Sequence, residues 1–250
     1  MERSVLITGS AGGIGAAAVR HFHNQGWATY ATDRREVAPD IEAVRFFPSD
    51  VSDPESVETL FSWLGGHTGA LHALVNNAAI QISKPIAEMG VEEWDRTMAS
   101  NLRSVFLTAR SGYGLLKAAG QAAIVNVSSV HAVATSTGIA AYAASKGGML
   151  ALTKAMAIEF AGDQIRVNAV LPGAVDTEML RSGLGRGHVA GDSVESRLND
   201  LGARTVMGRV GKPDEIASAI YFLADKEQSS FMTGNTLVVD GGATARLSTE

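Results

Sequence analysis

Seven short runs of apolar and β-branched residues recur along the chain and predict seven β-strands. They occupy residues 5–7, 27–32, 43–47, 71–75, 122–127, 165–170 and 236–239. The runs are nearly continuous rather than alternating between apolar and polar residues, which is typical of parallel strands buried on both faces. The pattern therefore predicts a parallel sheet whose two faces are both covered.

Segments with apolar residues at helical spacing separate these runs. One begins at residue 14, a second begins at Pro54 with Asp53 as its predicted N-cap, and three more cover residues 92–118, 141–161 and 213–224. Strands that alternate with helices favour an α/β fold. We therefore expect a single doubly wound Rossmann-type domain, with a seven-stranded parallel sheet and helices on both faces.

The length of the chain suits one domain that spans residues 1–250. No internal repeat or linker divides it. Residues 176–209 are rich in Gly, Arg, Ser and Asp, and they form a connection much longer than the usual ~2–6 residues. We expect this segment to be a lid of the same domain.

The composition is that of a globular enzyme, with 46% hydrophobic and 19% charged residues. The net charge of -5 and the absence of a long basic run disfavour nucleic acid and anionic membranes as partners. No apolar run reaches the ~18 residues of a membrane span. With no cysteine and no signal-peptide pattern before the first strand, we expect a cytoplasmic protein without disulfides or thiolate chemistry, and we expect no metal site.

A glycine-rich loop joins the first predicted strand to the first helix. Its glycines Gly9, Gly13 and Gly15, with Ser10 and Ile14 between them, would let the backbone approach the pyrophosphate of a dinucleotide at the helix N-terminus. A glycine cluster alone can be a tight turn. Its place between a strand and a helix favours a cofactor site.

The second and third predicted strands end in acidic residues. Asp33 lies about 20 residues beyond the glycine loop, where a carboxylate can accept hydrogen bonds from the adenosine ribose and repel a 2′-phosphate. Arg34 and Arg35 follow directly, and either arginine can hold the phosphate of NADP or lie on a solvated turn. We expect NAD, with NADP less favoured. Asp50 and Val51 are candidates for the adenine edge, although Asp50 can equally be a turn residue.

Tyr142 and Lys146 lie four residues apart at the start of a predicted helix, so their side chains share one face. A nearby ammonium favours the phenolate and should lower the pKa of Tyr142 toward neutral pH, as a general acid and base requires. Such a pair is by itself more often a surface pair. Ser129 follows the fifth strand at the edge of the sheet where ligands of these folds bind, although serine is also a common turn residue.

Several motifs in order resemble those of the short-chain dehydrogenase/reductase family. They are the loop at residues 8–15, Asn76-Asn77-Ala78-Ala79, Asn101, Ser129, Tyr142-Ala143-Ala144-Ser145-Lys146 and Pro172-Gly173. The similarity extends from Val5 to Gly242 and is greatest to the compact branch that includes 3-oxoacyl-acyl-carrier-protein reductases. It implies an NAD(P)-dependent oxidoreductase that acts on an alcohol or carbonyl group, and a homotetramer.

The resemblance also implies roles for individual residues. Tyr142 would be the general acid and base, Lys146 would hold the nicotinamide ribose, Ser129 would orient the substrate oxygen, and Asn101 would anchor a water in a proton relay. The cofactor groove would further be lined by Asn76, Ala78, Pro172, Gly173, Val175 and Thr177. Ala79 departs from the glycine usual in the family, so the backbone there must avoid positive φ.

The substrate is less defined than the reaction, and a sugar, polyol, hydroxy acid or 3-oxoacyl compound would suit the pattern. His131 can contact a polar substrate or be a surface histidine. A cationic lid would favour a substrate with a carboxylate or phosphate, although such charges are more often simply solvated; the candidates are Arg181, Arg186, His188, Arg204 and Arg209. The alternative to an enzyme is a catalytically silent dinucleotide-binding sensor or scaffold.

Overall fold

Seven parallel strands form one sheet in the computed structural model, which describes residues 2–186 and 189–245. The strands are β1 (Ser4–Thr8), β2 (Ala28–Thr32), β3 (Arg45–Phe46), β4 (Ala73–Asn76), β5 (Ala122–Val127), β6 (Ile165–Pro172) and β7 (Thr236–Val239). Their spatial order is β3-β2-β1-β4-β5-β6-β7. The predicted seven-stranded parallel sheet is confirmed. Strand β3 is shorter than expected, because only Arg45 and Phe46 pair with β2 at this edge of the sheet.

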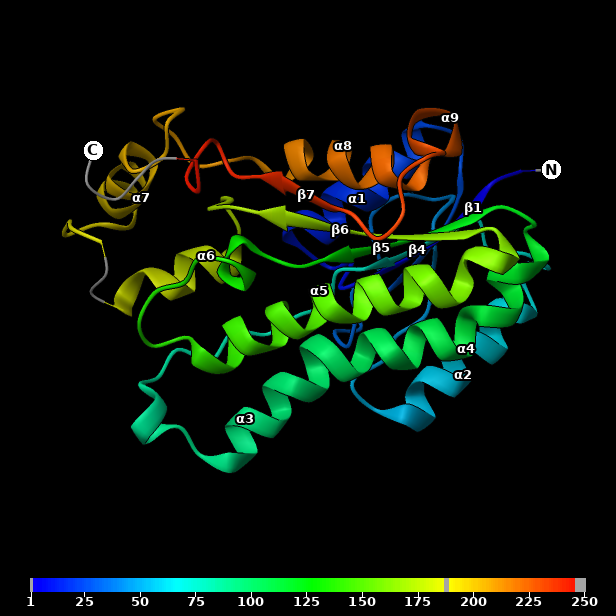
Figure 1. Ribbon diagram of the computed structural model, residues 1–250, viewed down its shortest axis with the longest axis horizontal. Coiled ribbons are helices and arrows are strands. Elements are labelled where there is room, and N and C mark those ends of the chain that lie inside the picture. The colour runs from blue at the N-terminus through cyan, green and yellow to red at the C-terminus, as the bar shows by residue number, and fades with distance from the viewer. Residues whose placement is uncertain (1, 187–188, 246–250) are drawn as a thin grey trace.

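Helices cover both faces of the sheet (Figure 1). Helices α1 (Gly13–Asn24), α8 (Pro213–Ala224) and the short α9 (Lys226–Ser229) lie on one face. Helices α2 (Pro54–Gly65), α4 (Ser104–Ala118) and α5 (Ala140–Phe160) lie on the other. Each layer encloses its own buried apolar cluster, so both faces of the strands are covered, as their sequences predict. In the described part of the chain, no helix is long and apolar enough to cross a membrane.

The order in which strands are added to the sheet reverses beside β1. From β1 the chain builds outward through β2 to β3, and it then returns to place β4 on the other side of β1. Ligands of open α/β sheets bind at such a switch point, beyond the carboxyl ends of the strands. The topology therefore brings the glycine loop, the end of β2 and the end of β4 to one edge.

The predicted helix at residues 92–118 is interrupted. The structure shows helix α3 (Val91–Met98), a π-helical turn η2 (Ala99–Arg103) and then α4. A π turn inserts one extra residue into a helix and is frequent at functional sites. Apolar periodicity does not reveal this insertion, because the helix continues on both sides of it.

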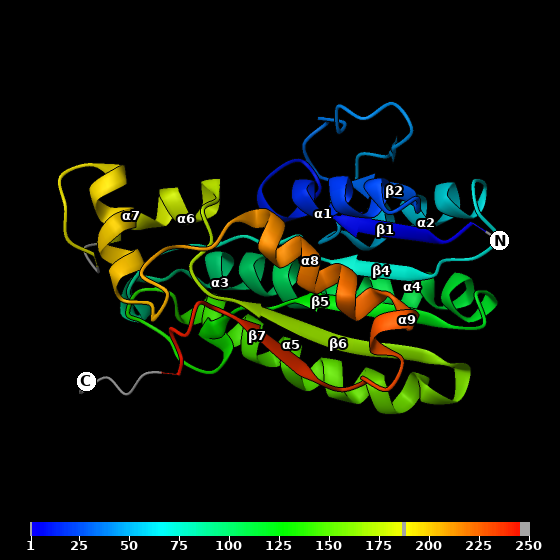
Figure 2. The same ribbon diagram turned by 90° about the horizontal axis from the view of Figure 1, so that it is seen from above.

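The segment at residues 176–209 contains helices that its composition did not predict. Helix α6 (Glu178–Gly183), the single turn η5 (Leu184–Arg186) and helix α7 (Val194–Ala203) lie beyond the carboxyl ends of the strands (Figures 1 and 2). Leu184, Val189 and Leu198 form a small apolar cluster of their own. The segment therefore packs as a separate layer over the edge of the sheet.

Candidate active site

The glycine loop turns sharply between β1 and α1. Gly9 and Gly13 have φ values of 68° and 52°, a region that favours glycine. A Cβ on Gly15 would lie 2.0 Å from the carbonyl oxygen of Gly9. The hydroxyl of Ser10 is buried and has no hydrogen-bond partner among the described residues. These features leave backbone N–H groups and one hydroxyl for a phosphate, so the loop fits a dinucleotide.

Asn77 fixes this loop to the end of β4, a role that we did not predict. Its side-chain Nδ2 donates to the carbonyl oxygens of Thr8, at 3.0 Å, and Gly9, at 3.1 Å. The Thr8 hydroxyl accepts the backbone N–H groups of Asn77 and Ala78, both at 3.0 Å. The only sequence signal was the position of Asn77 in the Asn-Asn-Ala-Ala motif. Ala79 has the negative φ that we expected, since Gln164 is the one non-glycine residue with positive φ in the described ranges.

Asp33 stands at the end of β2 and is almost buried. Its Oδ2 accepts the backbone N–H of Ala11 in the glycine loop at 3.0 Å. Its Oδ1 accepts the backbone N–H of Arg35 at 2.9 Å and Nε of the same arginine at 3.4 Å. Arg34 is exposed. The expected ribose-binding carboxylate thus lies against the glycine loop, and Arg35 rather than Arg34 accompanies it.

Asp50 and Val51 lie after β3, at the start of the connection to α2. The Asp50 carboxylate accepts the backbone N–H of Ser52 at 2.9 Å and its hydroxyl at 2.7 Å, which is the turn role that the sequence left open. Val51 is buried in the apolar cluster beneath the sheet. A contact of either residue with adenine remains a prediction.

The segment after β6 provides the opposite side of the cofactor site. Pro172 ends the strand, and Gly173 passes so close to Asp240 that a Cβ would lie 2.7 Å from the Asp240 Cα. Val175 is buried and pairs with Gly211. The methyl group of Thr177 would lie 3.1 Å from a Cβ on Gly13. Thr177 therefore faces the glycine loop across the switch point, while its hydroxyl caps α6.

Three buried side chains lie together beyond the carboxyl end of β5, those of Ser129, Tyr142 and Lys146. Tyr142 and Lys146 project from the first turns of α5, and Lys146 Nζ lies 5.6 Å from the centre of the phenol ring. The ammonium donates to the Val127 carbonyl oxygen at 2.7 Å, at the end of β5. The backbone N–H of His131 donates to Ser129 Oγ at 3.2 Å. The three side chains predicted to be catalytic therefore lie together, and their roles remain predictions.

The expected lowering of the Tyr142 pKa is wrong for this structure. Burial raises the pKa of Tyr142 to about 12, and a hydrogen bond with Ser129 opposes this rise. Burial also lowers the pKa of Lys146 to about 7. Spacing on a helix predicted that the two residues lie close together, but it could not show that the fold removes both groups from water.

Asn101 lies in the π turn and is fully buried. Its Oδ1 accepts the backbone N–H of Ile80 at 2.8 Å, and its Nδ2 donates to the Ile80 carbonyl oxygen at 2.9 Å and to Ser145 Oγ at 3.1 Å. Ser145 in turn donates to the Tyr142 carbonyl oxygen. The side chain thus ties the π turn to the helix of Tyr142, and its place in a proton relay remains a prediction.

The side chain of Asn76 does not face the cofactor groove as we expected. Its Nδ2 donates to Asn126 Oδ1 at 2.9 Å, and its Oδ1 accepts the hydroxyl of Thr108 at 2.7 Å. Asn126 then donates to Thr153. A buried polar chain therefore links α4, β4, β5 and α5 and uses both ends of the Asn76 amide. Ala78 packs beside the apolar cluster beneath the sheet.

His131 lies beside Tyr142, with its ring 6.1 Å from the Tyr142 ring in an edge-to-face arrangement. Its side chain is partly buried, so the surface alternative stands beside a substrate contact. Its contact with a substrate remains a prediction.

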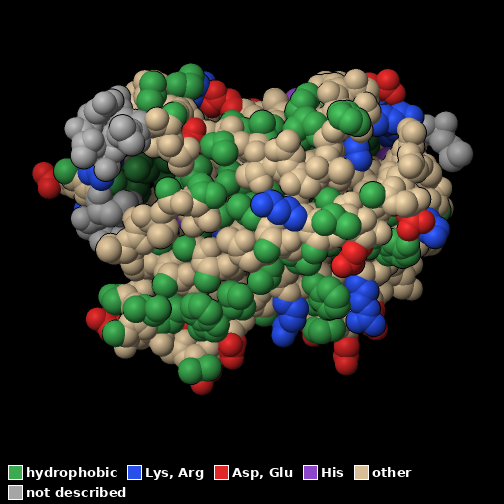
Figure 3. All heavy atoms as spheres, in the orientation of Figure 1, with side chains coloured by type: hydrophobic (Ala, Val, Ile, Leu, Met, Phe, Trp, Pro, Cys, Tyr) green, Lys and Arg blue, Asp and Glu red, His purple; other side chains and the backbone are tan. Residues whose placement is uncertain are grey.

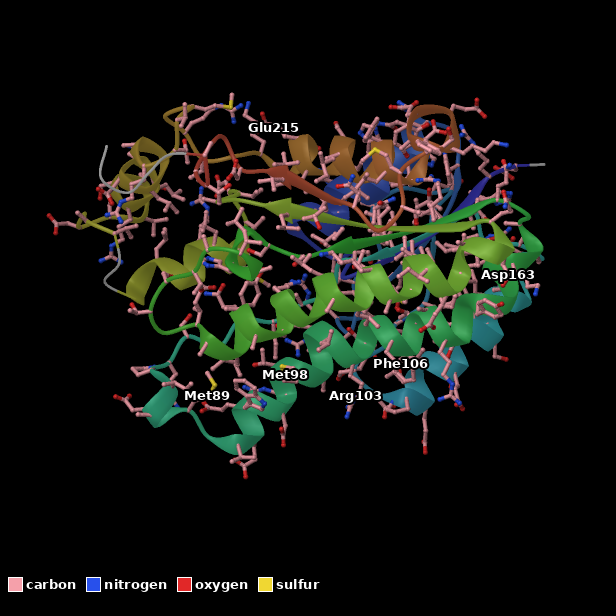
Figure 4. All side chains as sticks on the ribbon, viewed as in Figure 1. Met89, Met98, Arg103, Phe106, Asp163 and Glu215 are labelled. Carbon is pink, nitrogen blue, oxygen red and sulfur yellow. The ribbon has the colours of Figure 1, made fainter. Side chains whose placement is uncertain are left out.

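The lid arginines do not form a free cationic surface. Arg181 pairs with Asp176 at 2.7 Å, Arg204 with Asp200 at 2.7 Å, and Arg209 with Glu215 at 2.6 Å, near the start of α8 (Figure 4). The side chains of Arg186 and His188 lie outside the described residues. These three charges are already neutralised by neighbouring carboxylates, so they favour an anionic substrate less than the sequence suggests.

Comparison with known proteins decides the family. A family model described as enoyl-(acyl carrier protein) reductase matches residues 9–244. The chain is a short-chain dehydrogenase/reductase. It is 38% identical to cis-4-hydroxycyclohexanecarboxylate dehydrogenase of Sinomonas cyclohexanicum, over 98% of this chain and 97% of that protein. It is 37% identical to 3beta-hydroxysteroid dehydrogenase 1 of Eggerthella lenta, over 97% and 94%.

A solved structure agrees with this assignment. The ligand-free aldohexose dehydrogenase of Thermoplasma acidophilum superposes with a TM-score of 0.92 at 32% identity, over 99% of this chain and 96% of that one. The similarity extends along the whole length in each comparison. This short-chain dehydrogenase/reductase is therefore an oxidoreductase with the complete domain of its relatives, rather than a silent dinucleotide-binding scaffold.

Proposed function

We propose that the protein is an NAD-dependent dehydrogenase of cyclic secondary alcohols, with Tyr142 as its general acid and base. The observation that supports this most directly is the buried group of Tyr142, Ser129 and Lys146 at the switch point, beside a glycine loop that fits a dinucleotide. A bound NAD would supply the hydride acceptor. The protein supplies position, charge and a proton path.

In the direction of oxidation, Ser129 and Tyr142 hold the substrate hydroxyl between them, and Tyr142 as phenolate takes its proton. The backbone N–H of His131 donates to Ser129 Oγ and fixes it. The serine hydroxyl bonds with Tyr142 in this structure, and with a substrate between the two residues it would donate to the substrate oxygen. Lys146 is anchored on the Val127 carbonyl and stabilises the phenolate by its charge when it is protonated. In reduction, Tyr142 returns the proton to the alkoxide.

Asp33 favours NAD as the cofactor. Its carboxylate is placed at the end of β2 against the glycine loop, where it would accept ribose hydroxyls and repel a 2′-phosphate. Gly9, Ser10, Gly13, Ile14 and Gly15 would hold the pyrophosphate, and Val175 and Thr177 would contact the nicotinamide side.

The surroundings of Tyr142 favour a substrate with a carbon ring. Residues 130–134 are Val, His, Ala, Val and Ala, and they begin the connection from Ser129 to the helix of Tyr142. The neutralised lid arginines offer no strong site for an anion. Two of the relatives are named for alcohols on carbon rings, one of which also carries a carboxylate. Together these features favour an alicyclic alcohol over a phosphorylated or acyl-carrier substrate.

A substrate panel tests this proposal. NADH formation would be measured with cyclopentanol, cyclohexanol, a 3-hydroxysteroid, an aldohexose, a linear polyol and a hydroxy acid, each with NAD and with NADP. We expect the largest kcat/KM for a cyclic secondary alcohol with NAD. A clear preference for an acyclic hydroxy acid or for the reduction of a 3-oxoacyl thioester would contradict the proposed substrate class.

We further propose a cytoplasmic homotetramer, with residues 176–209 as a lid that closes over the substrate. Apolar side chains gather on the outer surface over α3 and α4 (Figure 3). Ile86, Val91 and Phe106 are exposed there, and Met98 and Phe106 lie along this outer side (Figure 4). An exposed apolar surface of this kind favours contact between copies of the chain.

A further inference from the structure

Arg35 bridges three parts of the cofactor site. Its Nε lies 3.4 Å from Asp33 Oδ1, and its Nη1 lies 3.5 Å from Glu178 Oε2. Its Nη2 lies 3.2 Å from the position that a Cβ on Gly12 would take. One guanidinium group therefore contacts the end of β2, the first residue of α6 and the glycine loop.

The position of Arg35 suits a contact with the 2′-phosphate of NADP, but the carboxylates of Asp33 and Glu178 compete for the same guanidinium. An arginine beside the ribose-binding acid can hold the 2′-phosphate of NADP. Here the charge of Arg35 is shared between Asp33 on one side and Glu178 on the other. A 2′-phosphate would therefore have to displace these carboxylates from the guanidinium.

We propose that Glu178 is a second determinant of cofactor specificity, acting from the lid side of the groove. It withholds the Arg35 guanidinium from a 2′-phosphate and adds a second negative charge where that phosphate would lie. This inference rests on the proposed use of NAD. It assigns selectivity to a residue outside the glycine loop and the β2 acid.

Electrostatic considerations favour a role of Glu178 in cofactor selectivity over a contribution to folding stability. A 2′-phosphate carries a charge of about -1.5 to -2 near neutral pH. Charges within a Debye length of ~10 Å still interact at moderate salt. By contrast, an ion pair with partners as exposed as Arg35 and Glu178, at 49% and 88%, contributes little to folding. A purely structural Glu178 would act as the acidic first residue of α6, and its loss would leave cofactor selectivity unchanged.

The test compares the affinities for NADPH and NADH by fluorescence titration at low ionic strength. In Glu178→Gln, we expect the ratio of the two Kd values, NADPH over NADH, to fall about threefold to tenfold, while the Kd for NADH changes by less than about twofold. In an Arg35→Gln background the same substitution should have a much smaller effect, because the released cation is absent. High salt should also reduce the effect.

Glu195→Gln is the matched control. It removes the same charge from another lid carboxylate, which pairs with Arg181 at the same distance of 3.5 Å. We expect no change in the Kd ratio. An equal fall in Glu195→Gln and Glu178→Gln would overturn the local role of Glu178, because it would show a general effect of lid charge.

The outcomes separate this inference from the proposed function. A wild-type protein that prefers NADH, with an unchanged ratio in Glu178→Gln, would overturn the role of Glu178 and leave the NAD-dependent activity standing. A wild-type protein that binds NADPH more tightly than NADH would overturn the proposed cofactor, and the role of Glu178 with it.

Discussion

Burial governs the protonation of the two central residues. Tyr142 is removed from water and its pKa is raised to about 12, so the neutral phenol is the resident form near pH 7. Lys146 is equally buried, and its pKa is lowered to about 7. The helix spacing of the two residues predicted their proximity. It could not predict the direction of the tyrosine shift, because that depends on how completely the fold removes both groups from water.

The raised pKa of Tyr142 predicts different pH profiles for the two directions of the reaction. Oxidation requires the phenolate, whose fraction increases with pH below a pKa of about 12. We therefore expect kcat/KM for alcohol oxidation to rise between pH 6 and pH 9, and kcat/KM for ketone reduction to stay nearly constant, because the neutral phenol that donates the proton predominates throughout this range. Initial rates in both directions would measure this. Oxidation that is independent of pH, or that slows as pH rises, would argue against Tyr142 as the proton acceptor.

Lys146 should lower the stability of the folded protein near neutral pH. Its pKa falls from 10.5 in the unfolded chain to about 7, so the folded state binds fewer protons between these values and the cost of burial is largest at and below pH 7. Lys146→Met should raise the free energy of unfolding by roughly 2–4 kcal/mol at pH 6.5 while activity is lost.

This gain should shrink as pH rises toward 10, because lysine is then neutral in both states. Thermal or denaturant unfolding at pH 6.5 and pH 9.5 would follow the difference. A variant less stable than the wild type at pH 6.5 would show that the bond to the Val127 carbonyl outweighs the cost of burial.

At the scale of elements, the sequence predicted the strands better than it predicted breaks within helices. Strands β5 and β7 have the predicted bounds, since continuous apolar runs end at turn residues. The π turn at Asn101 was missed because the helical pattern continues around it. The family resemblance implied that Asn76 lines the groove, but hydrogen bonds to Asn126 and Thr108 hold its amide inside.

The close turn of the glycine loop predicts that a methyl group at Gly15 impairs cofactor binding. Gly15→Ala would place a Cβ 2.0 Å from the Gly9 carbonyl oxygen, so the loop must move. We expect the affinity for NADH to fall about tenfold or more and the free energy of unfolding to fall by about 2 kcal/mol or more.

Gly114→Ala in α4 is the control for this substitution. A Cβ there has no neighbour within 4 Å, and alanine favours a helix, so stability should be unchanged or slightly higher and the affinity for NADH unaffected. Titration by NADH fluorescence and thermal unfolding would be applied to both variants. Wild-type affinity in Gly15→Ala would mean that the loop does not need its close turn.

For the whole molecule, the sequence predicted the architecture and left the substrate open. Strands that are apolar throughout must be covered on both faces, and the helices between them provide this cover in a doubly wound sheet. The segment at residues 176–209 was harder, since its polar composition concealed α6, α7 and their own apolar cluster. The ion pairs that neutralise its arginines depend on the folded positions of Asp176 and Asp200, which the composition does not reveal.

The exposed apolar surface over α3 and α4 predicts association. Light scattering at micromolar concentration should give the mass of a tetramer, about four times the 26.1 kDa of one chain. Phe106→Lys places a charge on this surface, where Phe106 is exposed in the single chain, and should shift the protein to smaller species. Phe231→Lys at an exposed position in the loop before β7 tests whether the effect belongs to this surface. A wild-type monomer would contradict the proposed assembly.

The most direct test of the account is the turnover of Tyr142→Phe with NAD and the best alcohol of the panel, measured beside its affinity for NADH. The substitution removes only the phenol oxygen that carries the proton. We expect kcat to fall by about 10²-fold or more while NADH binding changes by less than about threefold. Turnover close to that of the wild type, with NADH binding intact, would contradict the central claim that Tyr142 transfers the proton.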